Sequence, residues 1–179
     1  MVAVIVACEI GFWVVLGAGL VARYLLRMRR LGAALLLATA LVDLIALVAA
    51  VVDLRRGATA DWSHGLAALY IGFSVAFGPT MVRWADERFA YRFAGGPAPT
   101  KPPKYGMARA RYEWTLWLRA VVASAISGAL LFAAIRLVDD GERTEALGNT
   151  LSALPRVVVI WGIVALTYTI FPKTAKAIG

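Results

Sequence analysis

Five long apolar stretches dominate the chain and limit what it can fold into. They lie at about 2–26, 31–52, 64–82, 114–138 and 153–171. Each stretch is long enough to cross roughly 30 Å of hydrocarbon as a helix. None of them alternates apolar and polar residues, as the strands of a membrane β-barrel do. We therefore predict an all-α membrane protein in which residues 1–179 form a single domain of five transmembrane helices.

The composition excludes several classes of protein and site. Hydrophobic residues make up 61% of the chain and charged residues only 17%, whereas a soluble domain carries about 25% charged residues. The lone Cys8 rules out an intrachain disulfide, and the lone His64 cannot build a His-rich zinc site or a bis-His haem site. No common hydrolase, metalloprotease or nucleotide-binding motif is present. We predict no catalytic residue, no metal and no cofactor.

The charges between the apolar stretches divide into two groups, according to the side of the membrane that each connection would face. One side receives Arg27, Arg29, Arg30, Arg83, Arg88, Arg92, Lys101, Lys104, Arg109, Arg111, Lys173 and Lys176. The other side receives Arg55, Arg56 and Arg143, together with Asp53, Asp61, Asp139, Asp140, Glu142 and Glu145. Since basic loops remain in the cytoplasm, we predict an N-terminus outside, a C-terminus in the cytoplasm, and a multi-pass protein of a bacterial inner membrane.

The longest connection, residues 83–113, is predicted to be cytoplasmic. We expect Pro79 to kink or end the third span, because proline removes a backbone donor. An interfacial amphipathic helix should follow it, and the four prolines of Gly95–Lys104 favour an extended segment. The apolar positions of that helix, at helical spacing, are Val82, Ala85, Phe89 and Phe93.

Basic and aromatic residues flank this connection. The candidates for binding a protein partner or an anionic lipid are Arg83, Arg88, Arg92, Arg109, Arg111, Trp114 and Trp117. The alternative interpretation is that they only anchor two span ends in the aromatic belt. Nucleic acid is not expected as a partner, because topology and anionic lipid account for the net charge of +8 and no RNA-recognition motif is present.

Two acids, Glu9 and Asp43, lie inside apolar stretches, where an ionised carboxylate is costly unless it is paired, protonated or hydrated. One hypothesis is an outward-facing polar cavity that binds a ligand or exchanges protons. Its other lining candidates are His64, Tyr70, Ser74, Arg136 and Arg156. The alternatives are structural: either acid could pair with one of these arginines, and His64 could serve as a capping or interfacial group.

Small residues recur along the third apolar stretch, which suggests that helices approach closely there. They are Gly65, Ala68, Gly72, Ala76 and Pro79. Packing within the bundle is one interpretation, and a homo-oligomer interface is the other.

The run HGLAALYIGFSVAFGPTMVRWADERFAYRFAGGP resembles a segment of small uncharacterised multispanning membrane proteins from high-GC bacteria. The resemblance implies membrane location and no particular activity. Two functional hypotheses follow. The first is a small membrane protein that binds or helps translocate a small molecule, ion or lipid at the polar cavity. The second is an accessory or scaffold subunit that recruits a partner or anionic lipid through the basic connection.

Overall fold

The computed structural model describes residues 10–11, 13–15, 17–26, 28–93 and 95–172, and omits the side chains at 29, 36, 37, 39, 40, 43, 63 and 93. Its elements in order are η1 (Val21–Leu25, a π-helical turn), α2 (Arg29–Arg55), α3 (Trp62–Phe93), α4 (Gly106–Val138) and α5 (Glu145–Ile170). Residues 10–11, 13–15 and 17–20 are also helical. No strand occurs among the described residues, so the predicted all-α fold is confirmed for them.

Three helical segments are long and apolar enough to cross a membrane. They are His64–Arg92, Gly106–Val138 and Glu145–Ile170, found among the described residues. A shorter apolar helix spans Trp13–Leu25. The protein is therefore a multi-pass membrane protein, while the count of five spans and the orientation remain predictions.

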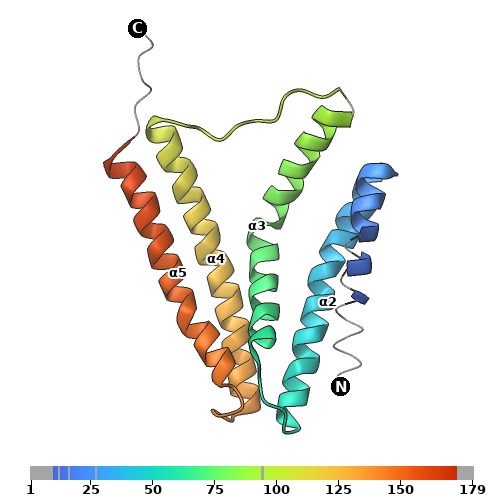
Figure 1. Cartoon of the computed structure of the whole chain (residues 1–179), viewed down its shortest axis with the longest axis vertical. Coiled ribbons are helices and arrows are strands. Elements are labelled where there is room, and N and C mark those ends of the chain that lie inside the picture. The colour runs from blue at the N-terminus through green and yellow to red at the C-terminus, as the bar shows by residue number, and fades with distance from the viewer. Residues whose placement is uncertain (1–9, 12, 16, 27, 94, 173–179) are drawn as a thin grey trace.

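α3 is the central helix of the bundle and packs against α2, α4 and α5. α4 and α5 form an antiparallel hairpin on one side of it, and α2 with η1 lies on the other (Figure 1). The helices converge at the end that holds loops 57–61 and 139–144, which we call the loop end. They diverge toward the end where residues 95–105 connect α3 to α4, which we call the linker end (Figure 1).

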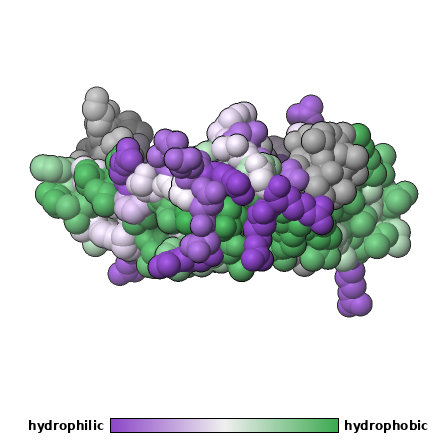
Figure 2. All heavy atoms as spheres, turned by 90° about the horizontal axis from the view of Figure 1, so that it is seen from below, coloured by the Kyte–Doolittle hydropathy of each residue, from purple (hydrophilic) through white to green (hydrophobic). Residues whose placement is uncertain are grey.

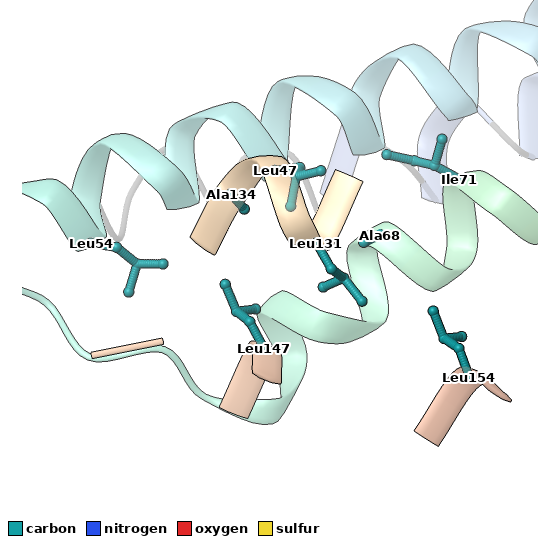
Figure 3. Close-up of a cluster of buried hydrophobic side chains, with 8 residues drawn as sticks. All are labelled: Leu47, Leu54, Ala68, Ile71, Leu131, Ala134, Leu147 and Leu154. Atoms are coloured by element: carbon teal, nitrogen blue, oxygen red, sulfur yellow. The ribbon is translucent and has the colours of Figure 1, made fainter. Parts of the chain in front are cut away.

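An apolar core fills the loop-end half of the bundle. Its buried members are Leu47, Leu54, Ala68, Ile71, Leu131, Ala134, Leu147 and Leu154. These side chains come from α2, α3, α4 and α5 and point toward one another (Figure 3). Seen from this end, hydrophilic residues gather across the middle, and hydrophobic residues occupy the flanks (Figure 2). A polar end surface with apolar sides is the expected pattern for helices whose sides face lipid.

Small residues allow α3 to approach its neighbours closely at two points. A Cβ on Gly65 would lie 2.5 Å from Thr150 Oγ1 of α5. A Cβ on Gly72 would overlap Ser127 Oγ and lie 2.5 Å from the Ala123 carbonyl oxygen of α4. Ala68, between these glycines, is fully buried. Packing within the bundle, one of the two interpretations of the small-residue stripe, is thus confirmed for these three positions.

Each of the four helices α2 to α5 begins before the apolar stretch that predicted it. α3 continues through Pro79 to Phe93, and α4 begins at Gly106, so the non-helical part of the predicted connection is short. α3 bends near its middle (Figure 1), as expected where proline removes one intrahelical bond. Apolarity stops at the membrane boundary, but a helix continues until a residue such as glycine or proline ends it.

α5 begins at Glu145 and contains Pro155 in its interior. A fifth span beginning at residue 153, as the apolar stretch predicts, would have this proline in its first turn, but the helix begins eight residues earlier. Asp140 closes the turn that precedes this helix, because its carboxylate Oδ1 accepts the backbone N–H groups of Glu142 (3.1 Å) and Arg143 (3.2 Å). The Thr144 hydroxyl also donates to the Asp140 carbonyl oxygen at 2.7 Å.

Candidate functional site at the linker end

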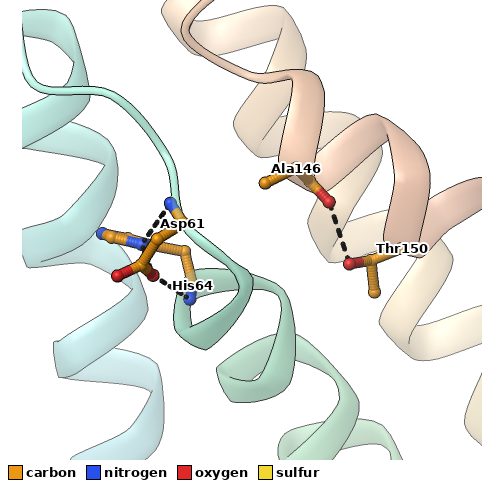
Figure 4. Close-up of polar contacts among 4 residues, drawn as sticks. All are labelled: Asp61, His64, Ala146 and Thr150. Atoms are coloured by element: carbon orange, nitrogen blue, oxygen red, sulfur yellow. Dashed lines mark hydrogen bonds and ion pairs between the residues drawn. The ribbon is translucent and has the colours of Figure 1, made fainter.

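The two intramembrane acids of the cavity hypothesis cannot be placed, because Glu9 and the Asp43 side chain lie outside the described residues. His64 is at the start of α3 (Figure 4). Its ring Nδ1 lies 2.7 Å from Asp61 Oδ1, and its backbone N–H donates to the same oxygen at 3.4 Å. The Asp61 N–H lies 3.2 Å from Nδ1. These reciprocal contacts have the form of a capping box.

The two arginines of the same hypothesis make local contacts on exposed surfaces. The guanidinium of Arg136 lies 5.1 Å from the ring centre of Phe132, one turn earlier on α4. Arg156 Nη2 donates to Ser152 Oγ at 3.4 Å, one turn earlier on α5. The centre of the bundle near the loop end is filled by the apolar core, so the described residues place hydrocarbon, rather than these charges, in the interior there.

Tyr70 and Ser74 are one turn apart on α3 and share a face of it. Tyr70 is exposed, and Ser74 is half-buried. The buried hydroxyl side chain at this depth belongs to Ser127 of α4. Its Oγ has no hydrogen-bond partner among the described atoms and lies against Gly72.

At the linker end, an ion pair joins η1 to the last turns of α3. Arg23 Nε donates to Asp86 Oδ1 at 2.8 Å, and Arg23 Nη2 donates to Asp86 Oδ2. The Arg23 side chain is only 9% exposed. The rings of Tyr24 and Phe89 pack beside it with centres 4.7 Å apart. A two-bond contact of this kind fixes orientation as well as distance, so η1 is held against α3.

A second ion pair lies at the start of α4. Arg109 pairs with Glu113, whose side chain is 6% exposed. The same guanidinium lies 5.0 Å from the ring centre of Tyr168 on α5, and its Nη1 donates to the Pro103 carbonyl oxygen at 3.4 Å. Arg109 therefore connects α4, α5 and the linker.

The two tryptophans predicted to bind a partner use their indole N–H groups inside the protein. Trp114 Nε1 donates to Thr169 Oγ1 at 2.9 Å, and Trp117 Nε1 donates to the Val158 carbonyl oxygen at 3.0 Å. Gly162 leaves room for the second indole, since a Cβ there would lie 2.9 Å from Trp117 Nε1. These residues, like Arg109, hold α5 against α4.

The remaining charges at this end are strongly unbalanced. Three acids lie between Pro79 and Ala120, against eight bases. Asp86 and Glu113 are in the ion pairs just described, and Glu87 Oε2 accepts the Thr100 N–H at 3.3 Å. Within the described part of the chain, seven of the eight bases form no ion pair. They are Arg83, Arg88, Arg92, Lys101, Lys104, Arg111 and Arg119.

The contacts of Asp86, Glu87 and Glu113 were not predicted from the sequence. Sequence spacing suggests an Arg83–Glu87 pair one turn apart, but Arg83 Nε donates to the Pro79 carbonyl oxygen at 3.3 Å. Arg109 and Glu113 have the same four-residue spacing and do pair. Nothing in the sequence points to the contact between Arg23 and Asp86, which lie 63 positions apart.

Comparison with known proteins gives one clear relative. The chain is 44% identical over 174 residues to the uncharacterized membrane protein YmcC of Bacillus subtilis (strain 168). The match covers 97% of this chain and 93% of the relative. The chain belongs to the YmcC family. This confirms the resemblance to uncharacterised membrane proteins, while a high-GC source remains a prediction. No family model and no solved structure matches the chain.

Proposed function

We propose that this member of the YmcC family is an accessory membrane protein that recruits an anionic partner at the cytoplasmic face of a bacterial cell membrane. The observation that carries the proposal is the charge imbalance at the linker end. Its acids are used in internal contacts, while seven bases are left without a carboxylate among the described residues. An unbalanced basic surface attracts anionic ligands and steers their association.

The proposed orientation follows the same charges. Bases gather at the linker end, and Asp61, Asp139, Asp140, Glu142 and Glu145 lie at the loop end or beside it. The positive-inside rule then assigns the linker end to the cytoplasm. Five spans, with the N-terminus outside, are part of this proposal.

Charge reversal at exposed arginines tests the proposed function. We expect Arg92→Glu with Arg111→Glu to remove an anionic component, lipid or protein, that copurifies with the protein from its native membrane. The matched control is Arg55→Glu with Arg56→Glu, which reverses two exposed arginines at the loop end. Circular dichroism verifies that both variants stay helical. Equal retention of all anionic components by the two variants would contradict the proposal.

A second candidate function is the binding or translocation of a small molecule, ion or lipid at a polar intramembrane site, alone or in a homo-oligomer. It is supported by the positions of Glu9 and Asp43 within apolar sequence, where acids commonly have functional roles. We expect Asp43→Asn to abolish any proton flux that the protein supports in liposomes containing a pH-sensitive dye. A flux that is unchanged in this variant would exclude Asp43 from the pathway.

A further inference from the structure

The last turns of α3 carry two faces of different character. On one face, Asp86 and Phe89 contact Arg23 and Tyr24. At 100° per residue, the positions 81, 84, 88 and 91 fall on nearly the opposite face. We call these residues, Met81, Trp84, Arg88 and Tyr91, the α3 stripe. The stripe therefore faces away from η1.

The α3 stripe is exposed even though three of its four members are large and partly or wholly apolar. Met81 is 67% exposed, Trp84 57% and Tyr91 56%. The guanidinium of Arg88 lies 3.8 Å from the ring centre of Trp84, a cation–π geometry that holds the charge over the ring. Aromatic rings combined with arginine are typical of side chains at the level of lipid headgroups.

The length of α3 places the α3 stripe at the level of the lipid headgroups. Its 32 residues extend about 48 Å, against about 30 Å of hydrocarbon and 40–45 Å for the whole bilayer. The apolar part begins at His64, near the loop end, so the last turns reach the headgroup layer on the opposite side. Four residues are also too few for a protein interface of ordinary size, which involves about 20–30 residues on each side.

From this geometry we propose that the α3 stripe binds the headgroup of an anionic phospholipid, with Arg88 on the phosphate and with Met81, Trp84 and Tyr91 against the glycerol and upper acyl region. The inference rests on the proposed function, since it names a lipid as the anionic partner. No acid lies on the stripe, and the neighbouring Arg92 adds a second positive charge without an ion pair among the described residues.

Native mass spectrometry of the full chain in detergent, titrated with phosphatidylglycerol or phosphatidylcholine, tests this inference. We expect Arg88→Ala to weaken phosphatidylglycerol binding about five-fold, which corresponds to about 1 kcal/mol for one basic residue near an anionic surface. Trp84→Ala should weaken it by a similar factor, because the ring holds the guanidinium in place. Binding of phosphatidylcholine should be weaker than that of phosphatidylglycerol and insensitive to Arg88→Ala.

The chain offers a matched control in Arg136, which forms the same kind of pair with an aromatic ring one turn earlier. It is near the loop end, and four acids follow it within nine positions of the sequence. Arg136→Ala should leave phosphatidylglycerol binding unchanged. The inference is overturned if this variant weakens binding as much as Arg88→Ala, if neither stripe variant weakens it, or if phosphatidylcholine binds equally well.

The two proposals fail in different ways. If the stripe variants keep their lipid but Arg92→Glu with Arg111→Glu still removes an anionic component, the lipid site is wrong and the accessory function stands. If no anionic component depends on any linker-end base, the accessory function itself fails.

Discussion

The loop end and the linker end of the same bundle are held together by different forces. At the loop end, side chains from four helices interlock in an apolar core, and Gly72 lets α3 contact α4 directly. The two loops are also joined there, since the Ala60 N–H donates to the Arg143 carbonyl oxygen at 2.8 Å. At the linker end, the described residues form side-chain contacts between pairs of helices, such as Arg23–Asp86 and Trp114–Thr169, and the buried cluster of the loop end does not include them.

The difference suggests where the molecule can change shape. An apolar core of interlocked side chains has few alternative packings, whereas a few side-chain pairs can open one at a time. Pro79 lies inside α3, between Ile71 of the loop-end core and Asp86 of the linker-end ion pair. α3 bends near its middle (Figure 1). Ligand-binding surfaces are commonly built at the less stable end of a structure, which agrees with a proposed anionic site at the linker end.

The largest expected effect comes from filling the helix contact at Gly72. Gly72→Val would place side-chain atoms onto Ser127 Oγ and the Ala123 carbonyl oxygen, so we expect a loss of roughly 3 kcal/mol or more. Thermal unfolding in detergent, followed by circular dichroism, measures it. Gly78→Ala is the control, because nothing lies within 4 Å of its Cβ position, and it should change stability by about 1 kcal/mol or less. Similar effects at both positions would contradict a close contact between α3 and α4 at Gly72.

A smaller and more local effect is expected at the linker end. Arg23→Ala removes a two-bond contact to Asp86, and such charged hydrogen bonds contribute about 1–3 kcal/mol. We expect faster hydrogen exchange in residues 21–26, with little change around Leu131 and Leu147. The swap Arg23→Asp with Asp86→Arg should recover part of the protection. Faster exchange throughout the core would show that the two ends are not independent.

The smallest effect concerns the start of α3. Asp61→Ala removes the oxygen that accepts the His64 N–H, and loss of such a cap costs about 1 kcal/mol. Asp61→Asn keeps an acceptor at this position and should lose less. Thermal midpoints of the two variants in the same detergent give the comparison. Equal losses would mean that the carboxylate charge, rather than the cap, is what stabilises this helix.

Part of this architecture could be predicted from residue patterns alone. Apolar length predicts the spans at 64–82, 114–138 and 153–171. The first two lie within a long apolar helix, and the third ends one residue beyond one, at Phe171. Small residues at Gly65, Ala68 and Gly72 predict a close helix contact. The identity of the partner helices could not be predicted, because a face of small residues allows close approach without specifying which helix approaches it.

At the candidate site, too, the sequence predicted some features and the packing of the helices decided the others. Sequence placed Trp114 and Trp117 at a span entrance, but only the packing of α5 reveals that both indoles bond within the protein. Arg88 is among the predicted lipid-binding residues, but Met81, Trp84 and Tyr91 beside it were not predicted, because the expected apolar face of that segment, which includes Val82 and Phe89, lies on the opposite side of the helix. Tyr24 contacts Phe89 on the face of α3 that packs against η1. This contact covers that face and leaves the α3 stripe exposed.

The sequence by itself determined that this chain is helical, crosses a membrane, and concentrates its bases between Pro79 and Ala120. These properties follow from the residue types within each stretch of the sequence, and they do not depend on which distant residues come into contact. Tertiary structure alone decided which of those bases are neutralised. Asp86 pairs with Arg23 from a distant part of the chain, whereas Arg88 lies over the ring of Trp84 and forms no ion pair among the described residues. An ion pair depends on where folding brings two side chains, and at the linker end that placement leaves the positive charge available for a ligand.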